Sequence, residues 1–207
     1  FTAPEDGQYE LRIRDSIYRG REDFVYRLAA TEVDAATGPD KLPEPDFKLE
    51  KVLEKEPNDN VASPQKVAFP SLVCGTINKP GDVDNFCIAG KAGDEVVMEV
   101  VARRLGSPVD SRLNVYDASG KKIKWNDDFE RLNVGLKTHH SDSYIRFKLP
   151  ADGQYTVQLS DTQHRGGAGC DYFLRLDRPK PDFKVYMQPS VINLEYGIGT
   201  AFLLHIV

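Results

Sequence analysis

The stretch YIRFKLPADGQYTVQLS, residues 144–160, decides the fold class of this chain. From 144 to 149, polar or amphipathic side chains take the even positions and apolar side chains take the odd positions. Successive side chains of a β-strand point to opposite faces, so this period of two predicts a strand with one face toward a core. Asp152-Gly153 supplies a turn, and the alternation resumes over 154–160. The stretch therefore predicts two consecutive strands.

The same period recurs in other short segments along the chain. An Asp117-to-Gly120 turn predicts that two of them, 111–116 and 121–125, form a hairpin. No segment keeps helical apolar spacing beyond about two turns, and 60–65 is the best helix candidate. Many short strands with Gly and Asp turns predict an all-β fold, an antiparallel jelly-roll β-sandwich. The predicted strands are 84–89, 94–103, 111–116, 121–125, 144–149, 154–160 and 170–176.

The chain also repeats itself. FTAPEDGQY at 1–9 matches FKLPADGQY at 147–155, and each copy continues through an Arg-Gly to an aromatic strand ending in Arg-Leu. The motif Pro-Asp-Phe-Lys follows each copy, at 45–48 and 181–184. We therefore expect four parts. They are the C-terminal strands of a preceding copy (1–34), a linker (35–50), a complete sandwich (51–178), and a linker with the first strands of a further, Ig-like β domain (179–207).

Composition bounds the function. A net charge of -5 with both signs interspersed argues against a nucleic-acid partner, which needs a basic face. No apolar run approaches the ~20 residues of a membrane helix, so no membrane insertion is expected. The three cysteines lack metal-like spacing and allow at most one disulfide; three buried thiols are the alternative.

Two acidic clusters, each broken by a turn former, lie close together in sequence. They comprise Glu54, Glu56, Asn58 and Asp59 in the first, and Asp82 and Asp84 in the second. Calcium prefers six to eight hard oxygen ligands in a flexible cage, which these side chains can supply if the first cluster folds back on the second. The alternative is a solvated loop in which Asn58 or Asp59 caps a short helix at 60–65. The sequence leaves both interpretations open.

A series of motifs in fixed order carries a family resemblance. The motifs are EPND at 56–59, GDVDNF at 81–86, AGD at 92–94, LGSPVDS at 105–111, NDD at 126–128 and PADGQY at 150–155. The series resembles the bacterial pre-peptidase C-terminal (PPC) domain, most of all the tandem copies in large secreted planctomycete-type proteins. The resemblance covers about 54–177 and, as the tail of another copy, 1–28. It implies a jelly-roll module that is appended to secreted enzymes or repeated in surface proteins and is not itself catalytic.

The related collagen-binding domains of clostridial collagenases hold calcium through a Glu-x-Glu-x-Asn-Asp linker and a later acidic pair. The resemblance therefore implies a Ca²⁺ site made by Glu54, Glu56, Asn58, Asp59, Asp82 and Asp84, the last two matching only approximately. Collagen binding is not carried over, because the sequence does not locate the aromatic face that binding uses.

No catalytic motif is evident: there is no Gly-x-Ser-x-Gly, and the adjacent His139 and His140 would point to opposite faces of a strand. We expect a non-catalytic, secreted, periplasmic or cell-surface module in a tandem array, whose partners are neighbouring domains of the same polypeptide. The alternative is a module that binds polysaccharide or an extracellular fibrous protein through exposed aromatics, with Trp125, Tyr116 and Tyr144 as candidates.

Overall fold

The computed structural model describes residues 5–13, 42–131, 138–181, 183, 185–188, 199 and 201–206. The chain divides into two compact units, Phe1–Lys41 and Leu42–Val207. Among the described residues, no helix combines the length and apolar character needed to cross a membrane.

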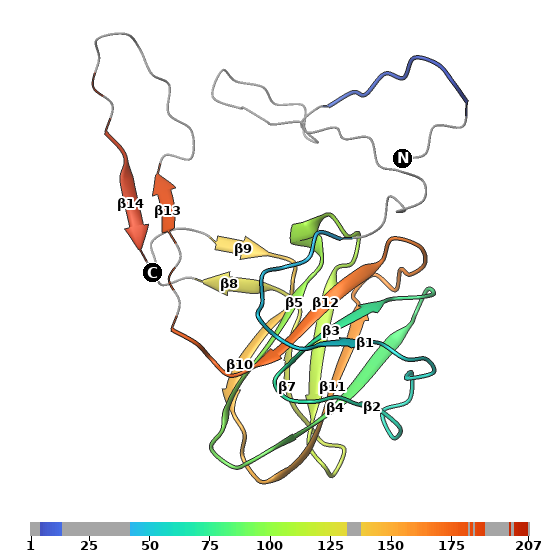
Figure 1. The fold of residues 1–207 in the computed structure, drawn as a ribbon, viewed down its shortest axis with the longest axis vertical. Coiled ribbons are helices and arrows are strands. Elements are labelled where there is room, and N and C mark those ends of the chain that lie inside the picture. The colour runs from blue at the N-terminus through green and yellow to red at the C-terminus, as the bar shows by residue number, and fades with distance from the viewer. Residues whose placement is uncertain are drawn as a thin grey trace. The chain divides into compact units, whose positions relative to one another are not determined.

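Ten strands of the second unit form two five-stranded sheets (Figure 1). The first sheet has the order β1 (Lys51–Leu53), β3 (Ser71–Thr76), β12 (Asp171–Asp177), β5 (Glu95–Val101), β10 (Tyr144–Lys148). The second has the order β2 (Gln65–Lys66), β4 (Val83–Gly90), β11 (Gly153–Asp161), β6 (Ser111–Tyr116), β7 (Lys122–Asn126). The short strands β1 and β2 pair in parallel with β3 and β4, and the other pairs of these sheets are antiparallel.

The prediction of an all-β jelly-roll sandwich is confirmed. The eight longer strands interleave as β3-β12-β5-β10 over β4-β11-β6-β7, the double Greek-key order of a jelly roll. The stretch 144–160 shows why: β10 belongs to one sheet and β11 to the other. The Asp152-Gly153 turn therefore carries the chain across the sandwich between two strands that do not pair.

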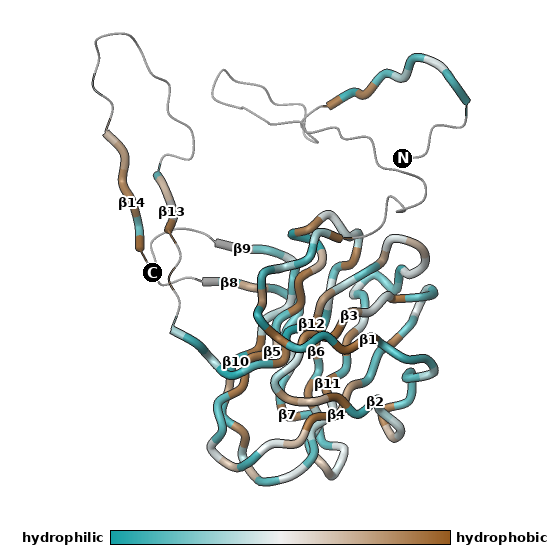
Figure 2. Tube along the Cα trace, viewed as in Figure 1, coloured by the Kyte–Doolittle hydropathy of each residue, from teal (hydrophilic) through white to brown (hydrophobic). Residues whose placement is uncertain are grey.

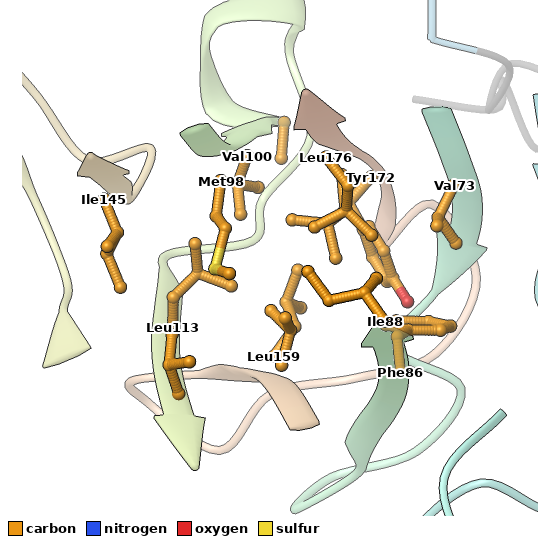
Figure 3. Packing of buried hydrophobic residues seen from close by; sticks show 14 of the residues in the cluster. Val73, Phe86, Ile88, Met98, Val100, Leu113, Ile145, Leu159, Tyr172 and Leu176 are labelled. Atoms are coloured by element: carbon orange, nitrogen blue, oxygen red, sulfur yellow. The ribbon is translucent and has the colours of Figure 1, made fainter. Parts of the chain in front are cut away.

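Hydrophobic residues of both sheets meet between them (Figure 3). One row across the first sheet pairs Ile145, Met98 and Leu176, all at most 5% exposed. Leu159 and Leu113 pair in the facing sheet and are fully buried. Figure 2 shows hydrophobic and hydrophilic residues interleaved along these strands, as expected when one face packs and the other meets water.

The predicted hairpin is also confirmed, with β6 pairing β7 across the Asp117 turn. Asp117 Oδ1 accepts hydrogen bonds from the backbone N–H groups of Ser119 and Lys121 at 2.9 and 3.1 Å. Gly120 has a φ of 79°, a left-handed conformation that suits glycine. The residue types of the turn therefore account for the tight reversal.

Buried carboxylates fix the loops at one end of the sandwich. Asp161, 3% exposed, accepts the N–H groups of Asp110, Gln163 and Arg165 at 2.7 to 3.0 Å. Asp142 is fully buried and accepts the N–H groups that open the 3₁₀ turn η1 (Arg103–Leu105). It also pairs with Arg104 Nε at 2.6 Å. The carboxylate oxygens of both residues accept hydrogen bonds from backbone N–H groups and a guanidinium, which holds the loops in place.

The predicted helix at 60–65 is wrong. Residues 60–63 form a turn in which Asn60 O accepts Ser63 N at 2.9 Å and Asn60 Oδ1 accepts Ala62 N at 2.9 Å. Gln65 already belongs to strand β2. Pro64 has no backbone N–H and disfavours the helical conformation in Ser63 before it, so the turn ends before a helix can form. Asn58 and Asp59 are therefore not helix caps.

Residues 5–13 of the first unit repeat one detail of the sandwich. The Tyr155 hydroxyl donates to Ala151 O at 2.6 Å, and the Tyr9 hydroxyl likewise donates to Glu5 O. Within the described residues of this unit, 8–13 carry no strand. Leu11 and Ile13 are 68% and 49% exposed. The second strand expected of this copy, within 14–34, lies outside the described residues.

Four more strands complete the described fold. β8 (Phe129–Arg131) pairs with β9 (Thr138–His140), and β13 (Val185–Gln188) pairs with β14 (Leu203–Ile206), both antiparallel. The last pair lies within 179–207, where the first strands of a further β domain are expected. The three cysteines are unpaired, in line with the alternative of three thiols.

Candidate metal centre

The first acidic cluster lies between β1 and β2 and folds back onto the end of the sandwich. Glu54 N donates to Cys74 O at 2.9 Å, which carries the β1–β3 pairing into the cluster. The side chain of Gln65 then bridges the segment, accepting Lys55 N at 2.8 Å and donating to Leu53 O at 2.9 Å. The segment 54–59, called the linker from here on although it joins β1 to β2, is therefore held against the sandwich by backbone and amide contacts that need no cation.

Asp84 belongs to β4, at a position that faces the inside of the sandwich. It pairs with the core residue Leu159 and is fully buried. Its Oδ2 accepts the hydroxyl of Tyr172 at 2.8 Å, and Tyr172 extends from β12 of the other sheet, with its ring among the core side chains (Figure 3). This hydrogen bond therefore joins the two sheets directly beneath the linker.

The linker carboxylates are oriented by donors from the sandwich. Glu54 Oε2 accepts Thr76 N at 2.7 Å, and its Oε1 accepts Asn58 Nδ2 at 3.0 Å and the Tyr172 hydroxyl at 3.3 Å. Glu56 accepts Asn58 N at 2.9 Å and Asn78 Nδ2 at 2.8 Å. Both glutamates are thus held facing the buried aspartates.

Two triads of carboxylates result, each with one oxygen per residue within 4.8 Å of the others. The inner triad is Glu54, Glu56 and Asp84; the outer triad is Glu56, Asp59 and Asp82. All six residues expected from the sequence are therefore brought together, with Asn58 bonded to both glutamates.

Three buried oxygens in this cluster have no hydrogen-bond donor. They are Asn58 Oδ1, Asp82 Oδ1 and Asp84 Oδ1, on side chains at most 2% exposed. A buried acceptor without a donor costs about 1–3 kcal/mol. Three such oxygens beside Glu54 and Glu56 form a donor set of hard oxygens, the type that Ca²⁺ binds. The residues present therefore fit a calcium ion.

The electrostatics agree with this donor set. Burial, together with the neighbouring Glu54 carboxylate, raises the pKa of Asp84 to about 10, and burial also raises the pKa of Asp82. By contrast, a hydrogen bond from the Lys79 ammonium lowers the pKa of Asp59. In the absence of a cation, the inner carboxylates therefore resist carrying a second negative charge. At the outer edge, the Lys79 ammonium already supplies a positive charge.

Sequence reasoning missed Tyr172 and Gly75. A Cβ on Gly75 would lie 2.7 Å from Glu54 Oε2 and would also collide with the Tyr172 hydroxyl, so only glycine admits both. A glycine inside a strand can mark such a close approach, and this signal was available at Gly75. No sequence signal marks Tyr172, because its role depends on which strand of the facing sheet passes Asp84.

The aromatic candidates lie on two opposite faces. Trp125 and Tyr116 occupy the outer face of the second sheet, where Trp125 pairs with Asn114. Tyr144 pairs with Glu99 on the outer face of the first sheet. The three residues therefore do not form one patch, and only the first two share a surface.

A cleft of about 570 Å³ lies on the outer face of the first sheet. Its charged lining residues are largely paired, as in Arg175 with Glu99 at 3.1 Å and Arg104 with Glu99 at 2.9 Å. Phe47 closes one side, with the Arg175 guanidinium 4.9 Å from its ring centre. No Ser, Cys, Thr or His is among the described residues that line this cleft, so those residues do not form a Ser-His or Cys-His pair there.

The chain was compared with family models, with curated proteins and with solved structures. No family model matches the chain. The sequence is 34% identical, over an alignment of 174 residues, to a probable subtilase-type serine protease of Deinococcus radiodurans. The alignment covers 77% of this chain. The match spans 23% of the length of that protein.

The fold is similar to solved structures at low sequence identity. One is the pre-peptidase C-terminal domain of a collagenase from Bacillus anthracis (9% identity, TM-score 0.41, 55% of this chain and 94% of that chain). Another is PliG of Aeromonas hydrophila, a periplasmic inhibitor of g-type lysozyme (17%, 0.38, 55% and 97%). A third is CorA of Methylomicrobium album BG8, a surface-associated copper-binding protein (10%, 0.36, 63% and 98%).

Proposed function

We propose that this chain contains a non-catalytic accessory module of the PPC type, secreted or exposed in the periplasm or on the cell surface, in which calcium locks the linker to the sandwich. The observation that carries the proposal is the convergence of three donorless buried oxygens with Glu54 and Glu56. The similarity to one segment of a longer protease supports a role beside other domains of one polypeptide.

The calcium ion would be held by Glu54, Glu56, Asn58 and Asp84, with Asp82 and Asp59 at the outer edge. Bound calcium would supply positive charge at a position surrounded by carboxylate and amide oxygens. The chain's own contribution is to present these acceptors from both sheets and from the linker. Because Glu54, Glu56 and Asn58 lie in the loop that joins β1 to β2 and Asp84 lies in β4, the ion would fix this loop, and with it the edge strands β1 and β2, to the rest of the sandwich.

Isothermal titration calorimetry of the chelator-treated protein with CaCl₂ tests the proposal. We expect saturable binding that is lost in a Glu54→Gln, Asp84→Asn double variant and retained in Asp94→Asn, a change in the turn at the opposite end of β4. Absence of binding to the unmodified protein would refute the calcium lock.

A second candidate function is recognition of a neutral polysaccharide by the outer face of the second sheet. Trp125 is 54% exposed, and the Arg112 guanidinium lies 5.1 Å from its ring centre. Beside them, Gln158 Oε1 accepts Asn114 Nδ2 at 3.2 Å and the Tyr116 hydroxyl at 3.1 Å. An aromatic ring next to a row of amides suits the apolar face and the hydroxyls of a sugar.

Affinity electrophoresis in gels that contain soluble β-glucan or xylan tests this function. The protein should be retarded in one of these gels, and Trp125→Ala should migrate freely while keeping its melting temperature. Equal mobility in gels with and without polysaccharide would count against the second candidate.

A further inference from the structure

Lys79 places an ammonium group in the outer triad of the acidic cluster. Its Nζ lies 3.0 Å from Asp59 Oδ2 and 3.6 Å from Asp82 Oδ1. The second of these oxygens is one of the three that lack a hydrogen-bond donor, and it lies just beyond hydrogen-bond distance of the ammonium. The outer triad of Glu56, Asp59 and Asp82 thus already contains one positive charge.

Backbone contacts hold Lys79 in this position, while its side chain is largely exposed to solvent. Lys79 O accepts Asp82 N at 3.1 Å, which closes the turn that carries both residues. Gly166 packs against the Lys79 backbone so closely that a Cβ there would overlap it. The Lys79 side chain is 61% exposed, so it approaches the triad from solvent and is not packed in place.

The two triads differ in this respect. Among the described residues, no Lys or Arg side chain contacts the inner carboxylates Glu54 and Asp84, whose donors are an amide, a backbone N–H and the Tyr172 hydroxyl. At the outer edge, Asp82 Oδ2 is occupied by Asn78 N at 2.6 Å, and its Oδ1 faces Lys79. The inner subsite therefore lacks a cation, and the outer subsite has a tethered one.

We propose that Lys79 is a built-in substitute for a second divalent cation, so that the protein binds one calcium ion, in the inner subsite, and Lys79 occupies the outer subsite. This inference rests on the proposed calcium lock and adds its stoichiometry. Removal of the Lys79 charge leaves Glu56, Asp59 and the donorless Asp82 Oδ1 facing one another without a cation. That is the arrangement of the inner subsite, and it should bind a second calcium ion.

The number of bound ions, measured by equilibrium dialysis against ⁴⁵Ca²⁺ and by titration calorimetry, tests the inference. We expect one ion per chain for the unmodified protein and two for Lys79→Gln. Lys79→Arg, which keeps the charge, should bind one ion. Lys55→Gln serves as the matched control, because Lys55 is an exposed residue of the same linker whose removal changes the net charge equally; it should also bind one ion.

The possible failures are distinguishable. Two ions in the unmodified protein, or one ion in Lys79→Gln, would overturn the role of Lys79 and leave the calcium lock intact. No ion in any variant would refute the calcium lock itself, and the inference with it. Circular dichroism melts in chelator establish that each variant is folded before ions are counted.

Discussion

Removal of calcium should lower the melting temperature of the sandwich, and Asp84→Asn should abolish most of that response. In chelator, Asn58 and Asp82 each keep a buried oxygen without a donor, at about 1–3 kcal/mol for each oxygen. An ion that binds only the folded chain stabilises it by about 2.7 kcal/mol when its concentration is 100 times the dissociation constant. In a domain of this size, each kcal/mol of stabilisation raises the melting temperature by about 4 °C, so calcium should raise the melting temperature by about 10 °C.

The Asp84 substitution separates the charge of the ligand from the packing of the site. Burial and the adjacent Glu54 carboxylate raise the pKa of Asp84 to about 10, so the metal-free protein at neutral pH already holds this group uncharged. Asparagine is a neutral side chain of similar shape whose Oδ1 still accepts the Tyr172 hydroxyl. In chelator, Asp84→Asn should therefore melt within about 2 °C of the unmodified protein.

In calcium, the unmodified protein and Asp84→Asn should differ in melting temperature. If the loss of one ligand charge weakens binding by about 100-fold, the stabilisation at the same calcium concentration falls to about 0.4 kcal/mol, or under about 2 °C. Differential scanning calorimetry in matched calcium and chelator buffers measures all four melting temperatures, with Asp94→Asn as the control that keeps the full response. Equal melting of the unmodified protein in both buffers, or a full response in Asp84→Asn, would refute the reasoning.

Three further predictions concern the supports of the site and the fold. Gly75→Ala should abolish the calcium response and cost about 1–3 kcal/mol of unfolding free energy, because its Cβ would lie 2.7 Å from Glu54 Oε2; urea titrations with and without calcium check this. Tyr155→Phe should cost about 1 kcal/mol by removing a buried 2.6 Å hydrogen bond, whereas Tyr9→Phe, at a site 49% exposed, should change the unfolding free energy by under about 0.5 kcal/mol; equal losses would contradict the burial argument. Burial raises the pKa of Asp161, but hydrogen bonds from backbone N–H groups and a guanidinium outweigh it and hold the pKa below the ordinary 3.8. Its stabilisation is thus complete above that ordinary value and is lost as the pH falls through the lower folded value, so Asp161→Asn should flatten the acid limb of a stability profile from about pH 2 to about pH 7.

Local pattern predicted much of the architecture because strand formation here follows a period of two. The alternation over 144–160 marked the strands β10 and β11, and the Asp117 turn marked the β6–β7 hairpin. The two copies of Asp-Gly-Gln-Tyr also form the same hydrogen bond, from the hydroxyls of Tyr9 and Tyr155 to the carbonyl of the residue four positions earlier. The helix candidate at 60–65 was wrong, because Pro64 and the pairing of Gln65 in β2 end the turn that Asn60 opens.

The sequence by itself determined the strand period and the turn residues, and it offered the six oxygen-bearing residues as candidate metal ligands. Only the tertiary structure decided that Asp84 turns inward, that Tyr172 of the opposite sheet meets it, and that Lys79 reaches the outer triad. The physical reason is that a period of two fixes which residues share a face but not which strands lie next to each other. Adjacency across the sandwich is set by the jelly-roll order and its packed core, and it brings together residues as distant in sequence as Glu54 and Tyr172.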